Sequence, residues 1–262
     1  MGSGEAAQIL VERERREAGV VVRLTVDNQA KLNVLDSRLT DQLRRAVEGL
    51  AAEAEAELRA VVLTGAGARA FIGGADVREL AALTPATARS FITGLHDLCA
   101  ALQALPVPVI ARIQGYCLGA GLEIAAACDL RAASEDARFA MPEVRVGIPS
   151  VIEAALLPRL VGMGRARELV LTGAPIDAAE ALAIGLVERV VPAEHLDAAV
   201  DDWLASILAA GPRALATQKR LLRQWQDLPL DEAIAKSIDA FAEAYESEEP
   251  RRLMRAFLER RR

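Results

Sequence analysis

Two glutamates, Glu123 and Glu143, occupy places in the sequence where a carboxylate is unexpected. Glu123 lies inside the apolar run 122–128, and Glu143 follows Met141-Pro142 among mostly apolar neighbours. Burying a carboxylate costs free energy unless a partner compensates it or a reaction uses it. Two such groups in one stretch of chain therefore suggest acid–base chemistry, in which one accepts a proton and the other donates one. The apolar neighbours of Glu143 should raise its pKa, which suits the donor.

The turn Gly119-Ala120-Gly121 stands at the start of the helix expected to carry Glu123. The first backbone N–H groups of a helix have no partner inside it, and the helix dipole places about half a positive charge there. Such N–H groups stabilise a carbonyl oxygen that gains negative charge. Ala120 and Glu123 share one helix face, so both should face one cavity. Structural roles stay open: Glu123 can be a first-turn acid, and Glu143 can form a surface salt bridge.

A second small-residue turn, 71–76, ends a strand-like run and should open another short helix. Gly73 and Gly74 let the backbone approach a ligand closely. The alternative is an ordinary turn in which Asp76 serves only as a helix cap. Two tight turns and two carboxylates are together the groups needed to move a proton beside a carbonyl.

Other catalytic motifs are weak or absent in the sequence. The segment 65–70, Gly-Ala-Gly-Ala-Arg-Ala, matches the dinucleotide pattern GxGxxG/A, but 71–74 prolong the loop where a helix should begin. The acid that would bind a ribose about 20 residues later is missing. There is no GxSxG or GxxxxGK[ST] motif, and His96, on a mixed helix surface, and His195 show no metal-binding spacing. We therefore predict neither a metal nor a cofactor.

The composition favours a soluble cytoplasmic protein. Of 262 residues, 52% are hydrophobic but only 3% are aromatic, and 31 basic residues against 37 acidic ones give a net charge of −6. A general nucleic-acid binder usually shows a basic face, and no apolar run reaches the roughly 18–20 residues of a membrane helix. Nothing resembles a signal peptide. Cys99, Cys117 and Cys128 lie in apolar surroundings without CxxC spacing, so we expect reduced core residues.

The elements that would position these residues alternate between strands and helices. Asp36 is expected to cap a long amphipathic helix that ends near Glu57, and Thr84 a helix from Pro85 to about Leu105. We predict an α/β core, residues 1–192, followed by a helical region, residues 193–262. The expected strands are 8–13, 20–26, 59–64, 109–113, 130–133, 138–140 and 186–191; 120–128 is expected to be a buried helix, and further helices should start at 177, 193 and 211–212.

From about residue 8 to its end, the chain resembles the enoyl-CoA hydratase/isomerase (crotonase) superfamily. The motifs that carry the resemblance follow one another in the family's order and at its separations. They are Asn28 and Asn33 within 27–35, Thr64-Gly65 leading into 70–76, the segments 114–123 and 128–131, Pro142-Glu143, and 146–149.

The resemblance implies a spiral of ββα units with a helical C-terminal region for trimerisation, commonly in a homotrimer or a homohexamer built as a dimer of trimers. It also implies an acyl-CoA thioester as the substrate, with its oxygen held by the N–H groups of Ala75 and Ala120. The family usually has glycine where Ala120 stands. Alanine keeps the N–H and suits a helix, so we expect this oxyanion hole to survive.

The resemblance also assigns roles to the other residues. Glu123 would orient and deprotonate a water for attack at Cβ of the substrate, and Glu143 would protonate Cα. The phosphates of CoA need cations, although each candidate can also be an ordinary surface charge. The cation candidates are Lys31, Arg69 and Arg78, and the other residues expected near the substrate are Ala70, Ile72, Gly73, Asp76 and Gly119.

One segment departs from the family pattern. Where typical hydratases continue Ile-Pro with a Gly-rich GAGGT turn, residues 150–155 read Ser-Val-Ile-Glu-Ala-Ala. The bulkier residues should reshape the acyl pocket, which puts simple short-chain specificity in doubt. They also add a third carboxylate, Glu153, which could select the substrate or act as a structural helix acid; the structural role is favoured.

The pair Glu123 and Glu143 favours a 2-enoyl-CoA hydratase, because many relatives with other activities lack one of the two. Three alternatives stay open on the sequence alone. They are an enoyl-CoA isomerase that moves a proton between carbons, a CoA-binding subunit without catalysis, and a dinucleotide-dependent reductase.

Overall fold

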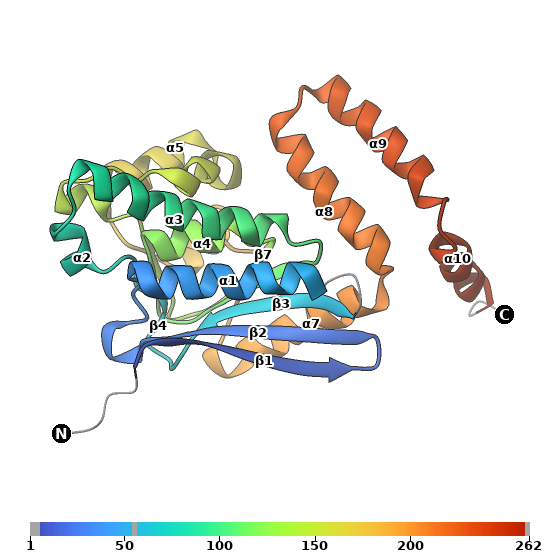
Figure 1. The fold of residues 1–262 in the computed structure, drawn as a ribbon, viewed down its shortest axis with the longest axis horizontal. Coiled ribbons are helices and arrows are strands. Elements are labelled where there is room, and N and C mark those ends of the chain that lie inside the picture. The colour runs from blue at the N-terminus through green and yellow to red at the C-terminus, as the bar shows by residue number, and fades with distance from the viewer. Residues whose placement is uncertain (1–5, 54–56, 260–262) are drawn as a thin grey trace.

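A computed structural model describes residues 6–53 and 57–259 of the chain (Figure 1). Its larger sheet has six strands in the order β1-β2-β3-β5-β7-β10. β1 and β2 pair antiparallel as a hairpin, and each later strand pairs parallel with its neighbour. The strands are β1 (Gln8–Arg16), β2 (Gly19–Asp27), β3 (Leu58–Gly65), β5 (Val109–Ile113), β7 (Leu130–Ser134) and β10 (Arg189–Val191).

A second sheet of short strands lies at the ends of the long ones. Its order is β4-β6-β8-β9, and β9 pairs antiparallel with β8. The chain repeatedly passes from a long strand to a short strand and then to a helix, which is the predicted succession of ββα units. The short strands are β4 (Ala70–Ile72), β6 (Tyr116–Leu118), β8 (Arg138–Ala140) and β9 (Ile176–Asp177); the helices of the repeats are α2 (Val77–Ala81), α3 (Pro85–Ala104), α4 (Ala120–Ala127) and α5 (Leu157–Thr172).

The predicted helix caps are present and set where the helices begin. The Asp36 carboxylate accepts a hydrogen bond from the Leu39 N–H at 2.7 Å, at the start of α1 (Ser37–Glu53). Thr84 and Thr87 form a reciprocal capping box at the start of α3, with Pro85 in the first turn. The expected end of the first helix, near residue 57, falls partly outside the described residues.

Two buried amides hold together the loops that flank the turns 71–76 and 119–121. The Asn33 side chain donates to the carbonyls of Ala66 and Ala70 at 3.0 and 2.8 Å. The Gln114 side chain donates to the carbonyls of Gly65 and Gly67 at 2.6 and 3.0 Å. Both residues belong to the sequence motifs, and their bonds satisfy carbonyls of the loop between β3 and β4 that would otherwise be buried without a partner.

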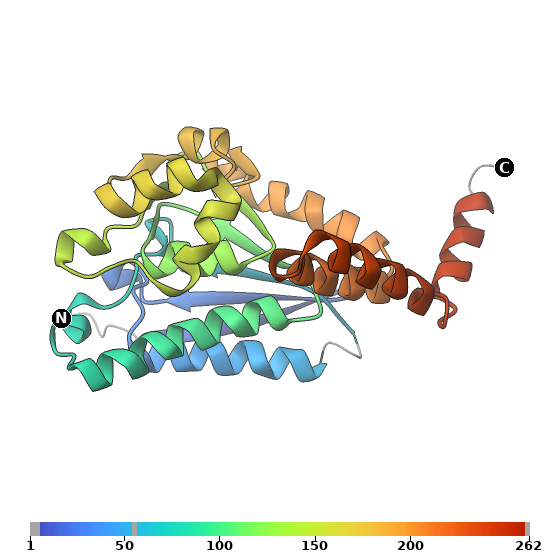
Figure 2. The ribbon, with the colours of Figure 1, turned by 90° about the horizontal axis from the view of Figure 1, so that it is seen from above.

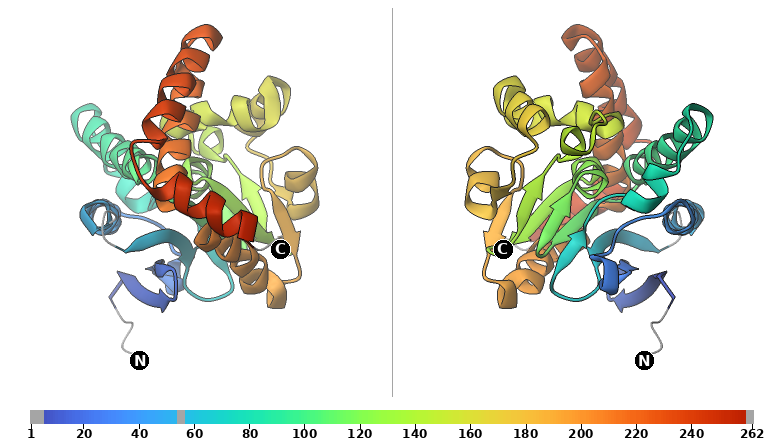
Figure 3. Two further views of the ribbon diagram at one scale, coloured as in Figure 1. Left: turned by 90° about the vertical axis from the view of Figure 1, so that its right-hand side faces the viewer. Right: turned by 90° about the vertical axis from the view of Figure 1, so that its left-hand side faces the viewer.

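Apolar side chains fill both faces of the larger sheet. One cluster joins the sheet to α1, α3 and α4, and the other joins it to α7 (Leu196–Ala209). Figures 1 and 3 show where these helices lie against the sheet. The three cysteines are free and buried, as predicted. No helix in the described ranges is long and apolar enough to cross a membrane.

The last three helices extend from one end of this core (Figure 2). They are α8 (Pro212–Asp227), α9 (Leu230–Ala244) and α10 (Glu249–Glu259). α7 packs on the sheet, so the first helix after residue 192 contributes to the core. The boundary at residue 192 stays a prediction.

One local expectation differs from the structure, and another is confirmed. The strand expected over 186–191 is only Arg189–Val191, because Leu186 and Val187 turn into the core after α6 (Ala178–Ala183). As expected, the glycine pattern of 65–70 opens no helix; it is a tight loop in which a Cβ on Gly65 would lie 2.0 Å from the Phe71 carbonyl oxygen.

Candidate active site

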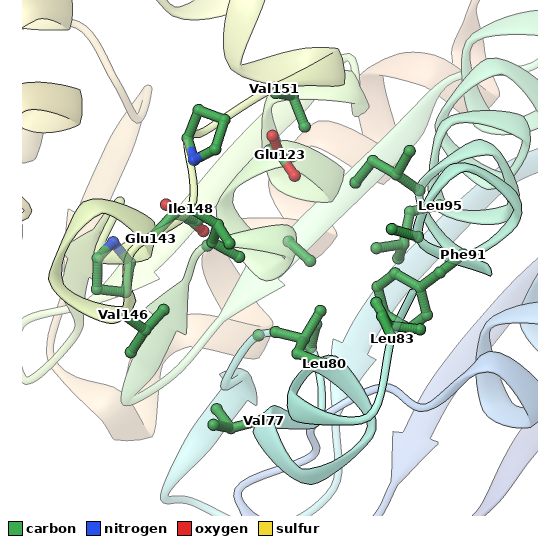
Figure 4. Close-up of a pocket in the computed structure, with 18 of the residues that line it drawn as sticks. Val77, Leu80, Leu83, Phe91, Leu95, Glu123, Glu143, Val146, Ile148 and Val151 are labelled. Atoms are coloured by element: carbon green, nitrogen blue, oxygen red, sulfur yellow. The ribbon is translucent and has the colours of Figure 1, made fainter. Parts of the chain in front are cut away.

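A cavity of about 740 Å³ opens between the turns 71–76 and 119–121, the helices α2 and α3, and the segment 142–151 (Figure 4). Its wall is largely apolar: Leu80, Leu83, Phe91 and Leu95 face Val146, Ile148 and Val151 across it. Glu123 and Glu143 supply carboxylates to this wall. An apolar cavity with a few convergent polar groups is the usual form of a small-molecule site.

Two backbone N–H groups at the cavity have no acceptor among the described residues. At Ala75, the neighbouring Gly74 carbonyl and Asp76 N–H both bond to Leu35, at 2.9 and 2.8 Å. This bridge leaves the Ala75 N–H directed away from Leu35. At Ala120, the first helical bonds run from Leu122 and Glu123 back to Gly119, so the Ala120 N–H is also unused. Both residues line the cavity and can donate to one oxygen there.

Glu123 is a buried carboxyl group whose surroundings disfavour its ionised form. Its side chain projects from α4, every residue of which is buried, and Glu123 is only 5% exposed. Burial, and then the negative charge of Glu143, raise the pKa of Glu123 to about 8. The Ala154 N–H donates to its Oε1 at 3.3 Å and partly offsets this effect. Glu123 therefore retains a proton at neutral pH in the free protein.

This raised pKa predicts a pH-dependent gain in stability for the Glu123→Gln variant. Between pH 4.5 and about 8 the folded protein binds a proton at Glu123 that the unfolded chain releases, so its free energy of unfolding falls as the pH rises. Glutamine has no such proton to lose. We expect the variant to gain up to a few kcal/mol over the wild type as pH rises through this range. Urea unfolding of both proteins from pH 5 to 8 measures the difference, and a constant difference would contradict the prediction.

Glu143 reaches the same cavity from η2 (Glu143–Val146). Its Oε2 accepts a hydrogen bond from the Ser150 hydroxyl at 2.7 Å. A Cβ on Gly119 would lie 2.3 Å from Glu143 Oε1, so a glycine is needed there for the carboxylate to approach the Ala120 turn. Contrary to expectation, Val144 and Val146 do not enclose Glu143, because both are exposed and Glu143 itself is half-buried.

The residues expected from the sequence divide into two groups in space. Those that line the cavity are Gly73, Ala75, Gly119, Ala120, Glu123 and Glu143. Ala70 and Ile72 are instead buried in β4. Asp76 is the cap of α2, accepting from the Arg78 N–H at 2.8 Å, and its Oδ2 lies 3.1 Å from Lys31 Nζ. Their contact with the substrate stays a prediction.

The cations expected near the CoA phosphates lie outside the cavity wall. Arg69 and Arg78 are exposed, and Lys31 is paired with Asp76. The negative charge of Asp76 is stabilised by this arrangement: its pKa is lowered first by the Arg78 N–H and then by Lys31. The role of all three cations in binding CoA stays a prediction.

Several residues at the site carried no strong sequence signal. The apolar residues of α2 and α3 that line the cavity follow an ordinary amphipathic pattern in the sequence. Nothing in the sequence around Ser150 predicts its hydrogen bond to Glu143. His96 looked like a surface residue, yet its Nδ1 lies 2.9 Å from Oε1 of the buried Glu153. Only the departure at 150–155 pointed to this part of the molecule.

Comparisons with known proteins identify the family of this chain. The sequence model described as enoyl-CoA hydratase/isomerase matches residues 15–262. The short-chain-enoyl-CoA hydratase of Clostridium acetobutylicum is 35% identical over 98% of this chain and 97% of its own. The 2,3-dehydroadipyl-CoA hydratase of Escherichia coli is 36% identical over 97% of each. A crystal structure of enoyl-CoA hydratase from Bacillus anthracis superposes with a TM-score of 0.90 at 31% identity, over 96% of each chain. By sequence and by fold, the chain belongs to the enoyl-CoA hydratase/isomerase family.

Proposed function

We propose that this protein is an enoyl-CoA hydratase, which adds water in the syn sense across the 2,3 double bond of a 2-enoyl-CoA thioester. The observation that carries the proposal is the meeting of Glu123, Glu143 and the unused N–H groups of Ala75 and Ala120 on one apolar cavity. The relatives named as hydratases of short-chain enoyl-CoA and of crotonyl-CoA support it.

In the proposed mechanism the thioester oxygen accepts hydrogen bonds from Ala75 and Ala120. A water oxygen forms a bond to Cβ as Glu123 takes one of its protons. The electron pair of the double bond moves into an enolate, whose oxygen charge the two N–H groups stabilise. Cα then takes a proton from Glu143. Before the next turnover Glu123 releases to solvent the proton that it took and Glu143 takes one up, so the net addition is one water molecule and the reaction needs no cofactor.

The carboxylate pair must hold one proton for this exchange, because Glu123 accepts a proton and Glu143 donates one. Hydration moves that proton from Glu143 to Glu123. The free protein already favours the proton on Glu123, since the pKa of Glu123 is raised to about 8. This is the state left by hydration and the starting state for the reverse dehydration.

The pH dependence of kcat/KM follows from the single proton that Glu123 and Glu143 must hold between them. Above pH 8 the pair loses its proton and no acid remains to protonate Cα. We expect kcat/KM to fall as the pH rises through about 8. Initial rates over pH 5 to 10 with saturating and limiting substrate measure the profile. A rate that kept rising to pH 10 would contradict the single-proton pair.

We also propose a homotrimer or a homohexamer, in a cytoplasmic location. Apolar side chains on one face of α9 are open to solvent in the single chain: Leu230 is 75% exposed, Ile238 66% and Phe241 69%. Burial of such a face against a second copy would remove apolar surface from water. This observation supports association, and sedimentation equilibrium measures the state.

A panel of 2-enoyl-CoA thioesters tests the proposed function. Hydration removes the conjugated double bond, so absorbance should fall and 3-hydroxyacyl-CoA should form. The isomerase alternative predicts the opposite, since moving the double bond of a 3-enoyl ester creates conjugation. Binding of CoA thioesters with no turnover of any of them would instead indicate a subunit without catalysis.

A further inference from the structure

A third carboxylate, that of Glu153, lies buried behind the cavity. Glu153 is 6% exposed and belongs to η3 (Ile152–Leu156). Its Oε1 is held by His96 Nδ1 of α3 at 2.9 Å, and its Oε2 is buried with no hydrogen-bond partner in the described chain. An incompletely satisfied buried carboxylate is costly to the fold. The two catalytic steps proposed above do not use it.

The backbone beside Glu153 is bonded to the proposed catalytic base. Ala154, the next residue, donates its N–H to Glu123 Oε1 at 3.3 Å. Ile152, the residue before, has a φ of +41°, in the left-handed region that β-branched residues rarely adopt. Such a conformation is strained and persists only where surrounding contacts impose it. Those contacts are the Ala154 bonds to Val151 and Glu123 and the bond between Glu153 and His96.

The charges around this pair come from every element packed on η3. α4 contributes Glu123, whose nearby charge is Glu143 of η2, and α3 contributes His96 and Cys99. The pKa of Cys99 is raised by burial and then by Glu153 and Glu123, so the three groups lie within electrostatic reach of one another. α5 also packs on η3: two of its arginines are bonded elsewhere, Arg159 to Gln226 and Arg165 to Glu168, and the third, Arg167, is exposed.

We propose that Glu153, anchored by His96, is a positioning residue for Glu123. The contact between His96 and Glu153 fixes the strained η3 turn, and the turn presents the Ala154 N–H to the Glu123 carboxylate. Glu153 also places a negative charge near Glu123, which helps the carboxylate pair to keep its proton. The inference rests on the proposed hydratase function, since it assigns a residue to that same site.

Three variants separate the hydrogen bond from the charge. Glu153→Gln keeps the shape and an acceptor for His96 but removes the negative charge. His96→Asn keeps a side-chain amide near the position of Nδ1, whereas His96→Ala removes the partner altogether. The control is His195→Asn, because His195 lies in η4 (Ala193–His195), away from the cavity wall.

We expect His96→Ala to lower kcat roughly tenfold with KM changed less than about twofold, since it disturbs the placement of a reacting group. His96→Asn should restore most of kcat, and His195→Asn should behave as the wild type. In Glu153→Gln the fall of kcat/KM in alkali should move to lower pH. A purely structural pair would lower the melting temperature of these variants while kcat and the pH profile stay at wild-type values, and that result would overturn the proposal.

A direct titration keeps the test independent of activity. In protein labelled with ¹³C at the glutamate carboxyl groups, the Glu123 signal is identified by its loss in Glu123→Gln. Its pKa should be lower in Glu153→Gln than in the wild type, and an unchanged pKa would overturn the proposal. If no thioester is hydrated, the proposed function fails, whereas this titration still decides whether Glu153 acts on Glu123.

Discussion

Replacing Glu143 with glutamine is expected to lower kcat for hydration by roughly 10²- to 10⁴-fold, the usual loss for a positioned acid. The reason is that Glu143 is the only proposed donor to Cα at the cavity wall. Glutamine still offers an oxygen to the Ser150 hydroxyl, which bonds to Glu143 at 2.7 Å, so the segment should keep its place. KM should change little, because the amide fills the same volume. Steady-state kinetics with a 2-enoyl-CoA measure both constants.

The control for this variant is Glu135→Gln, which changes an exposed acid between β7 and β8. It should leave kcat within about twofold of the wild type, as expected for a surface position. Full activity of Glu143→Gln would rule out the two-carboxylate mechanism. Equal loss in both variants would point to an effect of net charge.

The second large effect is expected at the backbone of Ala120. Proline at this position removes the N–H that we propose as a donor to the thioester oxygen, and loss of one such donor typically lowers kcat by about 10²–10³-fold. The fold should tolerate the change, because Ala120 is the first residue of α4, where a proline is favourable and no helical bond is lost. The proline ring also occupies space at the cavity, so KM should rise. Rates and circular dichroism of Ala120→Pro measure activity and folding.

A matched control is Ala193→Pro at the exposed start of η4. Pro192 before it already has an extended backbone, with ψ of 145°, which suits the residue preceding a proline. We expect wild-type kinetics for this variant. If Ala120→Pro folds and retains full kcat, the Ala120 N–H does not stabilise the enolate.

The local elements around the site could be predicted because their signals lie within a few residues. Asp36 and Thr84 are caps, and each bonds to an N–H three residues later in its own helix. The run around Glu123 was readable as a buried helix, since an apolar stretch after a small-residue turn has few other places to lie. The glycine pattern of 65–70 did not predict a dinucleotide-binding helix, because no helix signal followed it.

The partners of the charged side chains could not be predicted in the same way. Asp76 lies 3.1 Å from Lys31, which is far from it in the sequence, and Glu153 pairs with His96 of another helix. Apolar neighbours in sequence did not enclose Glu143, because Val144 and Val146 lie on the exposed side of a 3-10 turn. Neighbours in the chain are not necessarily neighbours in space, so sequence surroundings are a poor guide to the environment of a side chain.

By itself the sequence determined that two carboxylates and two turns with free N–H groups stand at fixed separations along an α/β chain. These features depend on residue type and on backbone conformation, which short segments largely specify. Only the tertiary structure decided that both glutamates and both turns line one cavity. It also decided that Glu123 is the carboxyl group whose pKa is raised to about 8, first by burial and then by Glu143. The contact between the buried Glu153 and His96 likewise exists only in the folded chain. The physical reason is that desolvation and charge–charge interaction depend on distances in space, which are set when the ββα units pack together.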